Sequence, residues 1–236
     1  MDSWRVANVF HLTISVFFNQ FLRGDMRHSD EVRALPLWID GRAYLKLPRA
    51  FHDVASPGSG QILRRVPLCA AEEIDAAVQA SRRANLAWAG MDMSKRQHML
   101  AALGDALAGL VDHFARLIVE ETGMDLQQAE GEVAKAALLF HRAVASSAEG
   151  VVAVLGGTPQ TFFALVNPVV AALMAGAALI VCPSLEAPAV VFALAELSGR
   201  CGFPPGVLNV LYVDARQAPV LFARAGITLL SCGEGR

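Results

Sequence analysis

The second half of the chain alternates short apolar runs with stretches of helical spacing, and this alternation restricts the fold more than any other feature. The apolar runs lie at residues 151–155, 178–182, 207–211 and 227–230, and the helical stretches between them at 166–175, 190–200 and 218–225. The first two runs contain only apolar side chains, as expected of strands that are buried on both faces. Strands and helices of this size, in alternation, form parallel βαβ units. The sequence therefore predicts an α/β fold with a doubly wound, Rossmann-like parallel sheet.

The residues before this alternation predict a mainly helical region that follows a few short strands. Strands are expected at 37–41 and 61–66, and the first and last helices at 70–88 and 126–144. Between these two helices, Ser94 is expected to cap a second one. A third is expected to end near Gly123. We divide the chain into an N-terminal extension, residues 1–34, and one domain, residues 35–236. Within this domain, a helical part covers residues 70–145 and a βαβ part covers residues 150–236.

The N-terminal extension contains an apolar run from Val6 to Leu22. Asn8, His11, Asn19 and Gln20 interrupt this run. A membrane span needs about 20 predominantly apolar residues, and each of these polar groups would have to be desolvated. We therefore expect an amphipathic helix here, or a protein whose translation starts at Met26, and no transmembrane segment.

Charge is sparse in this chain, and its mean hydropathy is high. Only 18% of the residues are charged, the formal net charge is −2, and the mean hydropathy is +0.41. A near-neutral chain does not suit a nucleic-acid-binding protein, which presents a basic face. The hydrophobic share of 54% excludes a disordered chain. We therefore expect apolar surface that a partner covers.

The cysteines and histidines indicate neither a disulfide framework nor a metal site. The four cysteines are widely separated, at Cys69, Cys182, Cys201 and Cys232, and the six histidines show no metal-ligand spacing. Because no secretory signal accompanies these cysteines, we expect a reducing, cytoplasmic compartment and no bound metal.

Seven segments occur in an order that resembles the N-terminal portion of the aldehyde dehydrogenase family. They include a Trp-Ile-Asp-Gly turn, a helix ending in Ala-Trp, a Glu-Glu-Thr-Gly helix end and a Gly-Phe-Pro-Pro-Gly turn into a strand. The segments are Trp38–Gly41, Ser56–Ile62, Ala70–Val78 with Ala87–Trp88, Glu120–Gly123, Glu130–Val133, Ala171–Ser184 and Gly202–Val210. The resemblance implies this family's cofactor domain and its reaction, the oxidation of an aldehyde to a carboxylate with NAD or NADP.

The chain departs from the family at the positions that carry the chemistry. In the family, the loop after the first sheet strand reads Pro-Trp-Asn, and its asparagine helps to hold the oxyanion of the reaction. Here the loop is Thr158-Pro159-Gln160-Thr161, and Thr161 stands at the position of that asparagine.

A second departure concerns the ribose of the cofactor. The family binds this ribose through the lysine and glutamate of a Lys-Pro-Ser-Glu segment, which reads Cys-Pro-Ser-Leu at residues 182–185. Glu186 is adjacent, and we interpret it as a carboxylate at a helix start rather than a ribose ligand. The resemblance thus places the cofactor positions at Thr158, Pro159, Cys182, Ser184 and Glu186. Without the charged pair, we expect weak binding of NAD and NADP.

Other candidate sites have simpler structural interpretations. Cys232 lies in a glycine-rich turn, but no histidine follows His141 and no lysine lies nearby to activate a thiol, so we interpret it as an ordinary cysteine. A tight strand-to-helix turn explains Gly156-Gly157. The acidic residues Glu120, Glu121, Glu130 and Glu132 are interpreted as solvated helix faces.

Two further parts of the family pattern are not matched in this chain. The family has a dimerisation arm at a place where this chain has only residues 145–150. The catalytic cysteine and glutamate of the family follow the portion that this chain matches. Three hypotheses remain: a degenerate protein that is inactive alone, half of a split dehydrogenase, or a non-catalytic interaction module. We also expect the parallel sheet to end at its fourth strand and to leave apolar surface for self-association or a partner.

Overall fold

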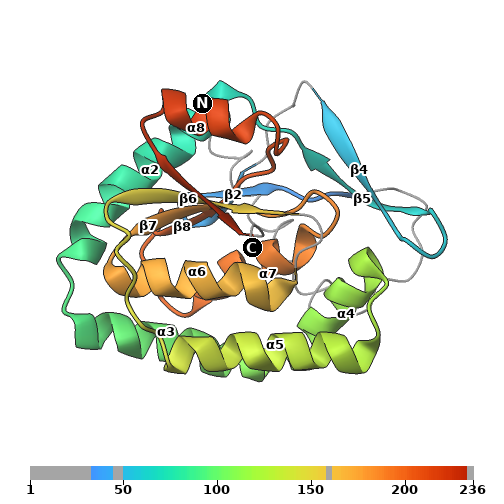
Figure 1. Cartoon of the computed structure of the whole chain (residues 1–236), viewed down its shortest axis with the longest axis horizontal. Coiled ribbons are helices and arrows are strands. Elements are labelled where there is room, and N and C mark those ends of the chain that lie inside the picture. The colour runs from blue at the N-terminus through green and yellow to red at the C-terminus, as the bar shows by residue number, and fades with distance from the viewer. Residues whose placement is uncertain (1–32, 45–49, 158–160, 233–236) are drawn as a thin grey trace, which may run out of the picture. The chain divides into compact units, whose positions relative to one another are not determined.

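The computed structural model describes residues 33–44, 50–157 and 161–232. The predicted N-terminal helix, the candidate cofactor positions Thr158 and Pro159, and the glycine-rich end at 233–236 lie outside the described residues. Within the described part, helices cover both faces of a central sheet (Figure 1).

The central sheet contains the four predicted parallel strands in the order β8-β7-β6-β9. Their bounds are β6 Val151–Gly156, β7 Ala178–Cys182, β8 Leu208–Val210 and β9 Thr228–Cys232. From β6 the chain adds β7 and β8 on one side, and then returns to add β9 on the other side. This reversal is the defining feature of a doubly wound sheet, so the predicted α/β class is confirmed.

The expectation that the sheet ends at its fourth strand is wrong, because two N-terminal strands extend it beyond β8. These strands are β2 Leu37–Ile39 and β3 Arg42–Tyr44. They form a hairpin through Asp40 and Gly41, whose φ angles of 56° and 71° match the positive values of a type I′ turn. The hairpin lies antiparallel to β8, where Trp38 pairs with Val210.

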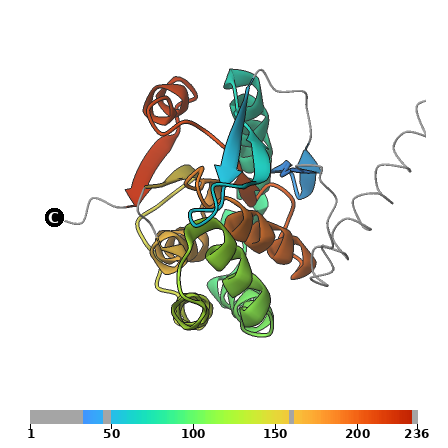
Figure 2. The same cartoon turned by 90° about the vertical axis from the view of Figure 1, so that its right-hand side faces the viewer.

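Two layers of helices cover one face of the sheet, and a single layer covers the other (Figures 1 and 2). α6 and α7 lie directly on the first face, with α3, α4 and α5 outside them. α2 and α8 lie on the opposite face. The bounds are α2 Ala71–Ala89, α3 Met93–Ala108, α4 Val111–Thr122, α5 Leu126–His141, α6 Phe162–Ala175, α7 Ala189–Arg200 and α8 Ala218–Arg224.

A separate three-stranded sheet lies beside this core, in the order β1-β5-β4. Its strands are β1 Arg33–Ala34, β4 Phe51–Ala55 and β5 Ile62–Pro67. This sheet carries Arg64, which becomes important at the candidate site. No helix among the described residues is long and apolar enough to cross a membrane.

Two predicted helix ends are wrong. α3 begins at Met93 with Asp92 as its N-cap, so Ser94 lies inside the first turn and does not cap it. α5 ends at His141 rather than at Val144. Gln97 terminates it, because its side-chain amide donates hydrogen bonds to the carbonyls of Phe140 (3.1 Å) and His141 (3.2 Å).

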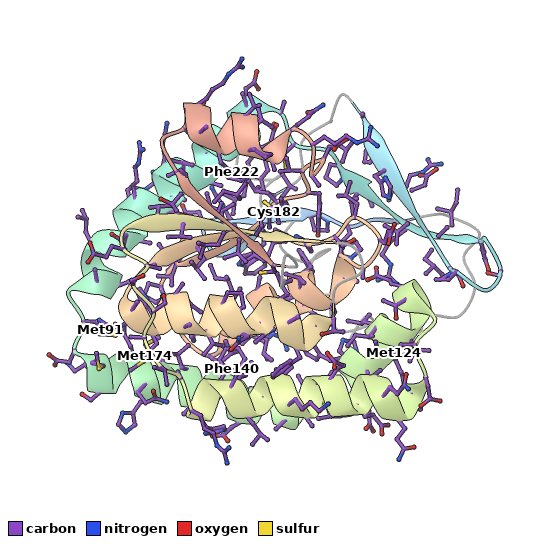
Figure 3. All side chains as sticks on the ribbon, viewed as in Figure 1. Met91, Met124, Phe140, Met174, Cys182 and Phe222 are labelled. Carbon is purple, nitrogen blue, oxygen red and sulfur yellow. The ribbon has the colours of Figure 1, made fainter. Side chains whose placement is uncertain are left out.

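A buried arginine joins the ends of two helices. Arg96 is only 6% exposed, and its guanidinium donates to the carbonyls of Met174 (3.1 Å), near the end of α6, and Trp88 (3.2 Å), near the end of α2. It also donates to the carbonyls of Ala89 and Met91. Figure 3 places Met91 and Met174 at the same end of the molecule. The last carbonyls of a helix carry partial negative charge, so one cation compensates both helix ends.

We expect Arg96→Met to lower the free energy of unfolding by at least about 3 kcal/mol, because it leaves several buried carbonyls without donors. Lys95→Met is the matched control, since the neighbouring Lys95 side chain is 72% exposed and makes only a 3.8 Å ion pair with Asp92. The control should change stability by less than about 0.5 kcal/mol in urea denaturation. Equal effects of the two substitutions would contradict this role of Arg96.

Candidate functional site

The candidate site lies at the carboxyl ends of β6 and β9, where the winding of the sheet reverses. Doubly wound sheets bind ligands in the crevice outside the strand ends at this point. The two strands approach closely here, since Gly156 pairs with Cys232. A Cβ atom on Gly157 would lie 2.9 Å from the carbonyl oxygen of Cys232, so the backbone requires glycine. Close approach to β9 thus accounts for Gly157, and the predicted turn continues into residues 158–160, which lie outside the described residues.

Thr161, the residue at the position of the oxyanion asparagine, is the N-cap of α6. Its hydroxyl oxygen accepts a hydrogen bond from the backbone N–H of Ala164 at 3.2 Å. The residue is exposed, and its backbone has the extended conformation usual for an N-cap. The hydroxyl therefore has a structural role that accounts for threonine at this position.

A carboxylate from the outer helical layer also binds the start of α6. Glu132 on α5 accepts a hydrogen bond from the backbone N–H of Phe163 at 3.1 Å. The interpretation of Glu132 as part of a solvated face is therefore wrong. A carboxylate is favourable at this place, because the first N–H groups of a helix carry partial positive charge.

The interpretation of Glu121 as solvated is also wrong, whereas the Glu120 side chain is 42% exposed, as expected of a solvated face. Glu121 is 2% exposed and binds the backbone N–H of Ala189 at the start of α7, at 3.0 and 3.3 Å. The buried guanidinium of Arg64 lies 3.3 Å from Glu121 and 2.8 Å from Glu120. The spacing in α4 could have shown this, because Glu121 falls four residues after Leu117 and so lies on the buried apolar face.

Burial dominates the electrostatics of Glu121. Removal from water raises the pKa of this carboxyl from 4.5 to about 7, while Arg64 and the Ala189 N–H act in the opposite direction. The phenol of Tyr212 shares this buried region, and burial also raises its pKa well above 10. The hydroxyl of Tyr212 donates to the carbonyl of Pro36 at 3.1 Å.

The structure separates the candidate residues around the predicted ribose site. Cys182, the last residue of β7, is 0% exposed. Ser184 is half-buried and accepts a hydrogen bond from the N–H of Glu186 at 3.3 Å. Glu186 is exposed, and the carboxylate that binds the start of α7 is Glu121. The interpretation of Glu186 as the carboxylate at this helix start is therefore not supported, because Glu121 binds the Ala189 N–H.

Only some of the predicted positions share a surface. Thr161 and Ser184, together with Pro183, lie in the wall of a hollow of about 30 Å³ between α4, α6 and α7. Cys182 lies on the other side of the sheet, toward α8 and Phe222 (Figure 3). The side chains at 182 and 185 do not fit the ribose of NAD or NADP, because neither can replace the family's charged ligands. The described residues contain no cluster of three or more metal-ligating side chains.

The raised pKa of Glu121 predicts a pH-dependent stability. Between pH 4.5 and about 7 the unfolded chain loses the Glu121 proton while the folded chain retains it. The free energy of unfolding should therefore fall by about 3 kcal/mol as the pH rises through this window. Urea denaturation at pH 5 and pH 8 should show a smaller fall in Glu121→Gln, in which Glu196, whose pKa burial raises to about 8, still contributes. Glu120→Gln should retain the full fall, and an unchanged pH dependence in Glu121→Gln would contradict the prediction.

Known proteins share both the sequence pattern and the fold of this chain. The model of the aldehyde dehydrogenase family matches residues 46–152 and 145–231. A mitochondrial succinate-semialdehyde dehydrogenase from Mus musculus is 31% identical over 215 residues, which cover 81% of this chain and 40% of that protein. Malonate-semialdehyde dehydrogenase 1 from Geobacillus kaustophilus is 29% identical over 208 residues, which cover 77% of this chain and 42% of that protein.

Solved structures confirm the fold. A lactaldehyde dehydrogenase superposes with a TM-score of 0.76 at 21% identity, covering 85% of this chain and 52% of that one. An aldehyde dehydrogenase from Brucella melitensis biovar abortus 2308 superposes with a TM-score of 0.73 at 23% identity, covering 83% and 46%. The chain spans about two fifths of the length of the curated relatives above. With its family pattern and fold in agreement, this chain belongs to the aldehyde dehydrogenase family.

Proposed function

We propose that this chain is an aldehyde dehydrogenase cofactor-domain protein that does not oxidise aldehydes by itself. The observation that carries the proposal is the extent of the match, residues 46–231, which corresponds to about two fifths of the curated relatives. The resemblance implies that the family's nucleophilic cysteine and general base follow the matched portion. The chain would thus contribute the sheet that supports a cofactor, but not the groups that attack an aldehyde.

We propose further that the chain binds NAD and NADP weakly. Family resemblance implies these cofactors, and one structural neighbour, a 3,6-anhydro-L-galactose dehydrogenase, is described in complex with NAP. In this chain the lysine and glutamate that would bind the ribose are replaced by Cys182 and Leu185. The loss of hydrogen bonds from two charged side chains should cost about 2–4 kcal/mol of binding free energy.

A second candidate function is the cofactor half of a split dehydrogenase. The arrangement of β9 favours it, because this strand pairs only with β6 among the described residues and its other edge has no strand beside it. An edge of this kind can accept a further strand from another polypeptide. A separate chain with the catalytic cysteine and glutamate would then complete the enzyme.

We propose that apolar surface makes the chain associate with itself or with a partner protein. Seven large apolar side chains of the described part are exposed, and they are distributed over four helices, one strand and the segment after α5: Phe51, Leu86, Met93, Leu126, Leu138, Val144 and Val220. The association would differ from the family's arm-exchanged dimer, since only residues 145–150 stand where that arm is inserted.

The cysteines support a reducing compartment, which we propose to be the cytoplasm. Cys69, Cys182, Cys201 and Cys232 all lie in the described part, and no disulfide joins them. A chain that functions in a reducing compartment retains its thiols in this form.

The purified chain should not reduce NAD or NADP in the presence of small aliphatic or aromatic aldehydes, because removing a nucleophile and its base lowers turnover by several powers of ten. Absorbance of the reduced nicotinamide measures this, with a full-length family enzyme as positive control. If turnover appears and Cys232→Ala abolishes it, Cys232 is a nucleophile and the proposal is wrong. Turnover that appears only after a separate catalytic chain is added would support the split enzyme.

Light scattering tests association. We expect the full chain to form oligomers or larger species, and a chain that begins at Met26 to associate more strongly if the stretch from Val6 to Leu22 covers apolar surface. Monodisperse monomers in both samples would contradict the proposed association. Equal association of both would show that the N-terminal stretch covers none of the surface involved.

A further inference from the structure

We infer that the place of the family's ribose-binding lysine is closed by packing in this chain, so that restoring the lost side chains would not restore a dinucleotide site. The inference rests on the proposed function, because the correspondence between Cys182 and that lysine comes from the family resemblance. It goes further than the loss of two ligands, since a site that only lacks ligands could be repaired by supplying them.

The neighbours of Cys182 within the sheet enclose it from both sides. Leu155 of β6 pairs with Cys182 on one side. On the other, the N–H of Leu211 donates to the carbonyl of Val181 at 3.0 Å, which continues the ladder past the end of β8. This register places Leu211 opposite Cys182 and Tyr212 one residue further along, and all three residues are 0% exposed.

A third segment closes the outer side of Tyr212. The N–H of Cys69 donates to the carbonyl of Tyr212 at 2.9 Å, and Cys69 is itself buried. Cys69 is near enough to interact electrostatically with Cys182, and burial raises the pKa of both thiols, that of Cys69 to about 12. The Tyr212 hydroxyl, bound to Pro36, joins a fourth segment to this cluster. Access from solvent thus begins only at Ser184, because Pro183 is also buried.

The helix starts near this edge of the sheet are also occupied. Helix N-termini bind the phosphates of many nucleotides through their first N–H groups. Here Glu132 binds the Phe163 N–H of α6, and Glu121 binds the Ala189 N–H of α7. Both carboxylates lie in segments that resemble the cofactor-binding family, Glu120–Gly123 and Glu130–Val133, so they do not distinguish this chain from it. The inference therefore rests on the packing at Cys182.

The test is to restore the family pair with Cys182→Lys and Leu185→Glu. A lysine at a closed position must displace its neighbours or bury an ammonium group, both of which destabilise the fold. We expect Cys182→Lys and the double variant to melt at least about 5 °C below the unaltered chain. The matched controls Cys182→Ser and Leu185→Glu should melt close to it. Neither NAD nor NADP at millimolar concentration should raise the melting temperature of any variant.

Two results would overturn the inference. One is a double variant that melts at the temperature of the unaltered chain, and the other is a double variant that NAD or NADP stabilises. If the double variant fails to fold, thiol labelling of the unaltered chain still decides the question. Under native conditions a small thiol reagent should modify the half-buried Cys201 and leave Cys182 unmodified, as read by peptide mass spectrometry. Labelling of Cys182 as fast as Cys201 would refute closure. Aldehyde turnover by the chain alone would contradict the proposed function, but not the closure.

Discussion

Helix α6 is held at both ends by charged side chains of the outer helical layer, and the other elements are arranged around it. Glu132 from α5 binds the backbone at its start, and Arg96 from α3 binds the carbonyl of Met174 near its end. Each charge has the sign that the helix dipole favours at that end. Because α6 connects β6 to β7, these contacts fix the central strand pair relative to the layer outside it. The same arginine also binds the end of α2, which lies on the opposite face of the sheet.

Sequence patterns predicted the elements where burial is uniform, and failed where a contact joins distant segments. The strand β7, Ala178–Cys182, was predicted residue for residue because every side chain in it is buried. Glu121 was misassigned because its partner Ala189 is 68 residues away along the chain. From the sequence, a buried charged residue of a helix looks like an exposed one unless its spacing from the apolar residues of that helix is considered. The first strand of the hairpin and its turn were predicted, but its place in the central sheet was missed for the same reason, since Trp38 pairs with Val210.

The sequence predicted where the candidate site lies, but not what its side chains contact. The alternation of strands and helices located the carboxyl edge where ligands bind in such sheets. It could not show that Thr161 caps a helix or that Cys182 is enclosed, because both depend on backbone geometry. The fold depends mainly on apolar burial and on the buried Arg96, Glu121 and Asn209, none of which needs a cofactor. The fold alone therefore does not establish what the chain binds.

The buried amide of Asn209 has a consequence for how the chain folds during synthesis. Its oxygen accepts a hydrogen bond from the N–H of Asp40 in the β2–β3 turn, across 169 residues of chain. The two hydrogens of its nitrogen are shared among the oxygens of Ser81, Leu179 and Gly206, which lie at 2.9, 3.2 and 2.8 Å. At ordinary translation rates, the hairpin must wait on the order of 10–30 s for this partner to be synthesised. Until then its apolar strand β2 has no sheet to join, so the emerging chain presents a site for chaperones that the finished protein conceals.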